Sequence, residues 1–148
     1  MRFLTITGAL LAMGLVLDGC SSPKTDPLTG SSWELTSIES MAPEEQPSTQ
    51  IKDPASYTMT FGSDGRAQFQ VDCNHGNGDW KAEPSSADSG KLTFGPIAMT
   101  LMFCPQPSSD TQVAAALGRV RTYLVSDGQL HLSLEADSGV MHWRPKAS

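Results

Sequence analysis

The sequence has few basic residues, and it contains no cluster of them. Ten Lys and Arg stand against 16 Asp and Glu, which gives the 148-residue chain a formal net charge of −6. Nucleic-acid binding requires clustered Lys and Arg that neutralise phosphates, and attraction to an anionic membrane requires a polybasic segment. We therefore expect the protein to bind neither nucleic acid nor an anionic membrane surface through electrostatic attraction.

The sequence also lacks a hydrophobic run long enough to span a bilayer. One apolar, uncharged stretch extends from Phe3 to Leu17. In a helix its fifteen residues, at about 1.5 Å each, fall short of a hydrocarbon core about 30 Å thick. With Arg2 before it, the stretch has the length and charge of a signal-peptide apolar region. We expect residues 1–19 to be a signal peptide.

The residues at the end of this stretch resemble the lipobox of bacterial lipoproteins. Leu17, Gly19 and Cys20 match it, whereas Asp18 occupies a position that usually holds a small uncharged residue. The resemblance implies cleavage before Cys20 and attachment of fatty acyl chains such as palmitate, which anchor a protein to a membrane. Because Ser21 stands where an Asp would signal inner-membrane retention, it also implies an outer-membrane lipoprotein facing the periplasm. The alternative is an ordinary secretory signal with an incidental Cys20.

Cysteine is scarce, and its count of three is odd. Lipidation of Cys20 leaves Cys73 and Cys104 as an even pair, and an oxidising envelope favours a disulfide between them. The alternative is a pair of buried free thiols, which behave as small apolar residues.

Long helical patterns are missing too, and apolar residues instead recur mostly at every second position. Residues 20–31 contain almost no large apolar side chain, so we expect a flexible tether there and one folded domain over 32–148. The alternation predicts strands near 33–38, 57–61, 67–71, 78–81, 92–94, 99–103, 123–125, 130–134 and 141–143. Helical spacing predicts one helix at about 109–119. The expected fold is mainly β, an antiparallel sheet curled into a barrel or sandwich with one helix.

The folded part resembles the META domain of HslJ-like bacterial lipoproteins. The matching segments are Trp33-Glu34-Leu35, Phe61 to Asp64-Gly65, Cys73-Asn74, residues 92–100, Met102-Phe103-Cys104, Ala116-Leu117, Tyr123, Leu130-His131-Leu132 and Val140-Met141-His142-Trp143. Two residues depart from the pattern, since Asp72 replaces a Gly and Phe103 replaces a small residue. The resemblance implies a small antiparallel β-barrel of the lipocalin type with one packed α-helix. It also implies a cell-envelope protein connected with stress, motility or drug tolerance, without enzymatic activity.

The chain lacks a constellation typical of catalysis or metal binding. Cys73, His75, His131 and His142 have metal-binding atoms but not the paired spacing of a zinc site, so we predict no metal and no cofactor. Asp72, Asn74, Asn77, Asp79 and Glu83 resemble a calcium loop only weakly, and a Gly/Asn-rich connection explains them better. Ser63 lies in a strand–turn–strand context rather than in a nucleophile elbow. We therefore predict that the protein is not an enzyme.

Two loops are the predicted recognition elements. The segment 42–56 is longer than most connections in compact domains, and with 82–90 it is placed to rim the mouth of a barrel. The leading hypothesis is a non-catalytic lipoprotein that binds an unknown envelope protein or small ligand through these loops. The alternatives are mobile surface loops without a partner and an inhibitor of a cell-wall hydrolase. Ser138-Gly139, followed by His142 and Trp143, partly matches the motif of lysozyme-inhibitor lipoproteins.

Overall fold

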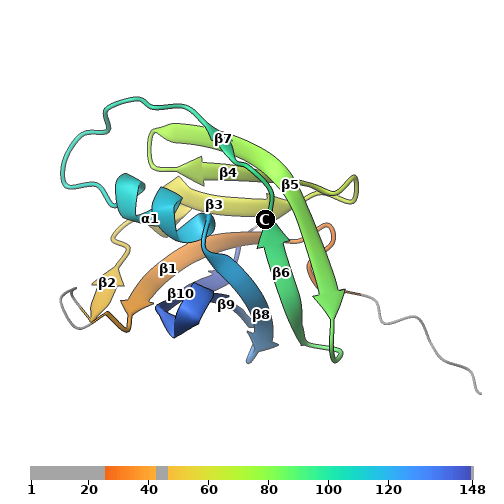
Figure 1. Ribbon diagram of the computed structural model, residues 1–148. Coiled ribbons are helices and arrows are strands. Elements are labelled where there is room, and N and C mark those ends of the chain that lie inside the picture. Colours follow the sequence, from red (N-terminus) through yellow and green to blue (C-terminus); the bar gives the residue numbers. More distant parts are fainter. Residues whose placement is uncertain (1–25, 43–46, 148) are drawn as a thin grey trace, which may run out of the picture.

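The computed structural model describes residues 26–42 and 47–147 (Figure 1). The predicted signal peptide at 1–19 and the predicted lipidation site Cys20 lie outside the described residues, as does part of the 42–56 segment. Within the described part, no helix is both long enough and apolar enough to cross a membrane.

Strands dominate the described residues. In chain order they are β1 (Ser32–Ser40), β2 (Ser48–Gln50), β3 (Tyr57–Phe61), β4 (Arg66–Val71), β5 (Asn74–Pro84), β6 (Ser89–Phe94), β7 (Ala98–Met99), β8 (Val120–Ser126), β9 (Gln129–Leu134) and β10 (Gly139–Pro145). The α-helix α1 (Asp110–Leu117) lies between β7 and β8, and two short 3₁₀ turns cover Pro54–Ser56 and Glu135–Asp137.

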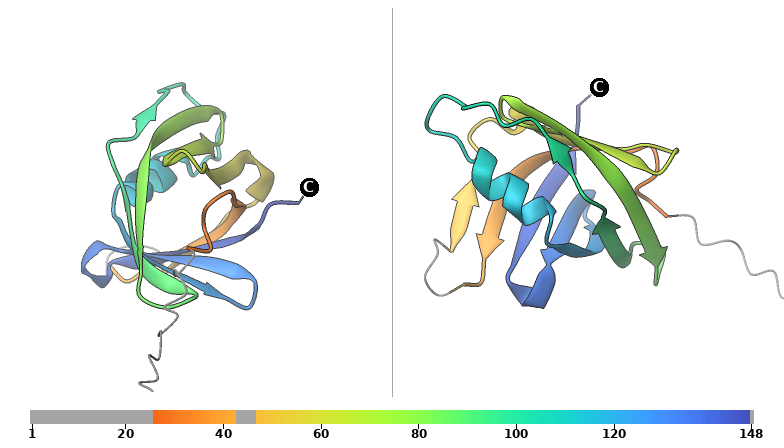
Figure 2. Two further views of the ribbon diagram at one scale, coloured as in Figure 1. Left: turned by 90° about the vertical axis from the view of Figure 1, so that its right-hand side faces the viewer. Right: turned by 45° about the horizontal axis from the view of Figure 1, so that its top comes forward.

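Eight of these strands close into an antiparallel barrel. Its order is β1-β10-β9-β8-β6-β5-β4-β3, and the pairing of β10 with β1 in addition to that of β3 with β1 closes the ring. Figure 2 shows the strands arranged around the ring with α1 packed against them. The predicted fold, a mainly β barrel of the lipocalin type with one helix, is confirmed.

The barrel interior is filled by side chains. Trp33, Tyr57, Phe61, Phe69 and Trp143, the residues whose alternation indicates the inner face, are all buried. Val113, Ala116 and Leu117 of α1 add to the same core. A small barrel packed in this way leaves little interior room for a ligand, so recognition must use its surface or its ends.

The two ends of the barrel carry different elements. At what we call the helix end, Tyr57 pairs with Val71, Val71 pairs with Asn74, and the Tyr57 hydroxyl accepts a hydrogen bond from the Ser109 backbone N–H. At the opposite, N-terminal end, the Gly30 backbone N–H donates to the Phe61 carbonyl. The segment 42–56 leads into β3 at the helix end, whereas the β5–β6 turn lies at the N-terminal end. The expectation that 42–56 and 82–90 rim one mouth is therefore wrong.

The folded domain begins earlier than the predicted boundary at residue 32. Leu28 is 0% exposed and belongs to the core. Gly30, at a φ of 77°, turns the chain back so that residues 26–31 pack beside the end of β3. Because one leucine in a polar stretch gives no periodic signal, the sequence pattern missed its burial, and the tether predicted over 20–31 is wrong for residues 26–31.

Two further expectations about connections are corrected. The segment 42–56 is not one open loop, because β2 pairs with β1 and Ile51 is buried. The Gly/Asn-rich connection expected around residues 72–83 is instead the start and middle of β5, an 11-residue strand that extends well beyond the predicted 78–81.

Candidate functional site

The most unusual surface of the described residues is a short apolar segment between β7 and α1. Leu101 is 95% exposed, Met102 56% and Phe103 89%. Only Ala98 and Met99 pair with β5, so the strand predicted at 99–103 is wrong beyond its first residue. We call residues 100–106 the apolar loop. Contiguous exposed apolar side chains of this size commonly mark interaction sites.

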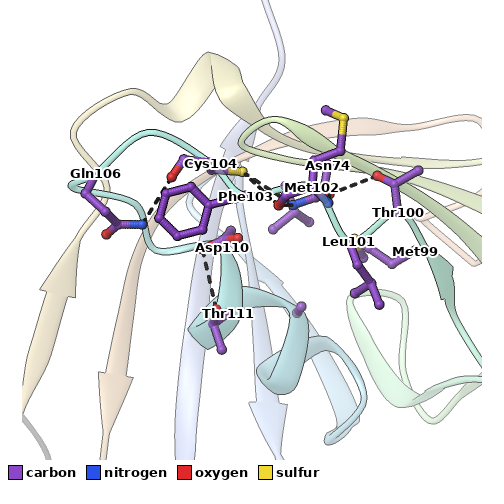
Figure 3. Close-up of a pocket in the computed structure, with 12 residues that line it drawn as sticks. Asn74, Met99, Thr100, Leu101, Met102, Phe103, Cys104, Gln106, Asp110 and Thr111 are labelled. Atoms are coloured by element: carbon purple, nitrogen blue, oxygen red, sulfur yellow. Dashed lines mark hydrogen bonds between the residues drawn. The ribbon is translucent and has the colours of Figure 1, made fainter.

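The side chain of Asn74, at the start of β5, holds this loop from inside (Figure 3). Its Oδ1 accepts hydrogen bonds from the Met102 backbone N–H at 2.7 Å and from the Thr100 hydroxyl at 2.9 Å. Its Nδ2 donates to the Met102 carbonyl at 3.1 Å. Asn74 is 5% exposed, so these bonds are shielded from competing water. One buried amide therefore replaces the strand partner that the loop lacks.

A disulfide fixes the same loop covalently. Cys73 and Cys104 are bonded, with their Cα atoms 5.5 Å apart, which is the pairing that the cysteine count favours. The bond joins the β4–β5 turn to the C-terminal part of the apolar loop. Covalent and hydrogen-bonded restraints therefore both act within residues 100–104.

The two departures from the family pattern are explained at this site. Asp72 adopts a φ of 55°, in the left-handed region where glycine is favoured and where Asp is among the better tolerated alternatives. Phe103 points into open surroundings, so a large residue meets no steric conflict there. Phe103 adds apolar surface to the loop where the family pattern has a small residue.

Two glycines of β5 let the chain segment before the loop lie directly on the strand. A Cβ added at Gly76 would lie 2.9 Å from Met99 Cε, and one added at Gly78 would lie 3.2 Å from the Pro96 carbonyl oxygen. Both approaches are closer than ordinary contacts. The glycines that favoured a loop interpretation of this sequence instead permit a close strand crossing.

A pocket of about 390 Å³ lies between the apolar loop and α1. Val71 and Met99 contribute apolar surface on the barrel side, and Ala114 does so from α1. Asp110 is the one charged side chain among its lining residues, and the sequence has no Asp, Glu, Lys or Arg between Lys91 and Asp110. The site therefore suits an uncharged, largely apolar group.

The other predicted chemical candidates are dispersed, with one exception. Cys73 is in the disulfide and His75 is exposed on β5, whereas His131 and His142 meet on the outer wall with their Nδ1 atoms 2.7 Å apart. Burial, together with the neighbouring His142, lowers the pKa of His131. No group of three or more His, Cys, Asp or Glu side chains suited to a metal occurs in residues 26–42 and 47–147.

The weak calcium-loop pattern does not form a loop. Its members follow the extended strand β5 and the turn before it, and Asp79 is 2.7 Å from Arg66 in an exposed ion pair. Ser63 lies in the β3–β4 turn, in the strand–turn–strand context that argued against a nucleophile elbow.

Comparison with known proteins identifies the family. A family model described as the META domain matches residues 26–147. The chain belongs to the META domain family. The matched range includes residues 26–31, in agreement with the burial of Leu28. No curated protein sequence matches the chain.

Solved structures support the META fold. The chain is similar to a protein from Burkholderia xenovorans solved by NMR, with a TM-score of 0.67 and 19% identity over 97% of this chain and 100% of that one. It is also similar to a DUF4847 family protein from Bacteroides vulgatus, with a TM-score of 0.56 and 13% identity over 80% of this chain and 94% of that one. At such identities the likeness establishes the fold alone. Together with the META match, it supports a small antiparallel barrel.

Proposed function

We propose that this META domain protein is a non-catalytic lipoprotein of the bacterial envelope that binds another envelope protein through its apolar loop. The observation that carries the proposal is the exposure of Leu101 and Phe103 on a backbone held by Asn74 and the disulfide. Burying such side chains against a partner gains about 25 cal/mol per Å² of apolar surface. A restrained loop also loses little conformational freedom on binding.

The position of the loop favours a protein over a membrane as the partner. The described chain begins at the N-terminal end of the barrel, whereas the apolar loop lies at the helix end, at the upper left of Figure 1. The five residues of β3 alone separate these ends by about 14 Å. An acyl anchor at Cys20 joins the folded domain at its N-terminal end, so the loop lies at the end of the barrel opposite the attachment point. The pocket, largely apolar apart from Asp110, suits an apolar protein surface without strong charge.

Inhibition of a cell-wall hydrolase is the alternative function. Its sequence basis is Ser138-Gly139, where Ser138 ends the turn before β10 and Gly139 begins that strand. A Cβ added at Gly139 would lie 2.3 Å from the Glu39 carbonyl oxygen. The motif is thus packed against β1 rather than carried on a projecting loop. A lysozyme assay with the purified chain tests this alternative directly. The stress or drug-tolerance role expected of the family belongs to the same proposal and requires a deletion phenotype.

The binding proposal is tested by site-specific photocrosslinking in cells, with a photoreactive amino acid in place of Phe103. The matched control carries the photoreactive amino acid in place of Leu124, an apolar residue of β8 whose side chain is 46% exposed on the barrel wall. We expect a discrete protein adduct from position 103 and none from 124. The captured protein, once purified, should bind Leu101→Ser at least tenfold more weakly than the wild type, and Leu124→Ser as well as the wild type.

Three results would contradict the proposal. They are an adduct with lipid only, the same adduct from both positions, and equal binding of the captured protein to both serine variants. The anchor is tested separately. Cys20→Ala should move the protein from the detergent phase to the aqueous phase, and unchanged partitioning would exclude lipidation of Cys20.

A further inference from the structure

A second constellation lies on the outer wall of the barrel, away from the apolar loop. His131 of β9 and His142 of β10 are directly opposite each other in the strand register. Their neighbours Leu130, Leu132, Met141 and Trp143 point into the core, so the strand alternation directs both imidazoles outward. Both rings are partly buried on that surface.

The His131 and His142 rings face each other through their Nδ1 atoms. Their Nδ1 atoms are 2.7 Å apart, and their planes are inclined at 76°. At this distance one neutral ring must donate its Nδ1–H to the lone pair of the other. A single proton therefore lies between the two Nδ1 atoms.

A carboxylate lies near the far nitrogen of the His142 ring. Glu39 Oε1 lies 3.4 Å from His142 Nε2. His142 Nε2 is buried and has no hydrogen-bond partner among the described residues. If His142 is the ring that donates through Nδ1, its bare Nε2 lone pair faces the Glu39 carboxylate, which is an unfavourable arrangement.

We infer that His131 and His142 form a binding site for a divalent transition-metal ion, with Cu²⁺ as the best fit. Both Nδ1 lone pairs bind the ion. The ring that had donated its Nδ1–H gives that proton to solvent and takes one up at Nε2, so no net proton is released. Each ring then carries its proton on Nε2, where His142 can donate it to Glu39. Carboxylates that accept from the far nitrogen of a metal-bound histidine are a common feature of metal sites.

The short nitrogen–nitrogen distance selects among metals. Two bonds of about 2.0 Å at right angles, as in tetragonal Cu²⁺, place the nitrogens about 2.8 Å apart, whereas a tetrahedral ion requires about 3.3 Å. The observed Nδ1–Nδ1 distance of 2.7 Å is close to the first value, and both rings then turn so that their lone pairs point at one ion beside the line that joins the nitrogens. Because no third protein ligand is present among the described residues, water must complete the coordination, and the site binds an exchangeable ion rather than a structural one.

The experiment titrates the purified full chain with Cu²⁺ by calorimetry and records the electron paramagnetic resonance spectrum of the one-to-one complex. We expect one ion per chain and hyperfine coupling to two imidazole nitrogens. His131→Gln and His142→Gln should each weaken binding at least tenfold. His75→Gln is the matched control and should bind within twofold of the wild type, because His75 is exposed on another strand. Zn²⁺ should bind more weakly than Cu²⁺.

The electron paramagnetic resonance spectrum of the wild-type complex identifies the ligands of the bound Cu²⁺ even if a variant fails to fold. A spectrum with oxygen ligands only, or with one imidazole nitrogen, would overturn the site. So would Cu²⁺ binding that survives in both His131→Gln and His142→Gln, or binding that His75→Gln removes. None of these outcomes bears on the apolar loop, which lies elsewhere on the barrel.

Discussion

Asn74→Ala should loosen the apolar loop and destabilise the whole domain. The substitution removes the hydrogen bonds to the Met102 backbone N–H and carbonyl and to the Thr100 hydroxyl. A net contribution of roughly 0.5–1.5 kcal/mol for each gives a range of about 1.5–4.5 kcal/mol for the three. Met102 is exposed enough for water to reach its backbone once the amide is gone. We therefore expect a loss of about 2–3 kcal/mol in the free energy of unfolding.

Two measurements check this prediction. Urea unfolding of the oxidised protein gives the change in free energy, and amide hydrogen exchange at Met102 reports the loop itself, where exchange should accelerate at least tenfold. Asn77→Ala is the matched control, because Asn77 lies on the same strand but makes an exposed hydrogen bond with Arg66. It should cost less than about 0.5 kcal/mol, as is typical of surface substitutions.

The reasoning fails if Asn74→Ala unfolds within about 0.5 kcal/mol of the wild type, the usual range of a surface substitution. It also fails if the Met102 amide exchanges no faster in the variant. Either result would mean that the disulfide alone holds the loop.

Three further substitutions test the fold around the site. The double substitution of Cys73 and Cys104 by Ala should lower the free energy of unfolding by about 3–4 kcal/mol in the chain-entropy model, because the disulfide joins residues 31 positions apart. An unchanged midpoint of urea unfolding would refute this. Leu28→Ala should cost about 2–4 kcal/mol, since Leu28 is fully buried, whereas a flexible tether would show no change in thermal unfolding. Gly76→Val should cost about 1–3 kcal/mol through collision with the Ala98 carbonyl oxygen, which lies 3.0 Å from an added Cβ; calorimetry against the wild type measures this.

Much of the barrel was predictable because its hairpins are specified by neighbouring residues. Gly65 and Gly128 adopt φ values of 78° and 72° in tight turns between alternating strands. Their Asp-Gly pairs signal such turns in the sequence. The helix was predictable for the same local reason, since its apolar spacing and its end at Gly118 lie within one short segment.

The apolar loop was not predictable, because distant residues determine its conformation. Met99, Leu101 and Phe103 alternate as strand residues do, yet the backbone leaves β5 after the hydrogen bond from the Thr100 N–H to the His75 carbonyl. The cause is Asn74, 28 positions before Met102, together with the disulfide. Alternation in the sequence shows which side chains are apolar, but it does not show whether a partner strand is available. The Cys-Asn pair of the family pattern was the one signal that pointed to this anchor.

The strand β5 was underestimated for a related reason. Gly76 and Gly78 lower strand propensity, so the sequence favours a connection at that point. In the structure the same glycines allow residues 96–99 to cross closely over the strand. The glycines lower the strand propensity of their own segment, whereas the residues that they allow to approach are about twenty positions further along the chain. A prediction from neighbouring residues therefore detects only the lowered propensity.

The restraints on the apolar loop explain why exposed apolar side chains persist there. A free loop containing Leu101, Met102 and Phe103 would fold back to bury them, since each gains free energy by leaving water. Asn74 and the disulfide oppose this collapse by fixing the backbone on either side of Met102. Natural sequences tend to break a local rule of this kind at functional sites. The same rigidity lets a partner bury the side chains without first ordering the backbone. Weakening Asn74 should therefore reduce partner affinity as well as stability, even though Asn74 is itself too deeply buried to contact a partner extensively.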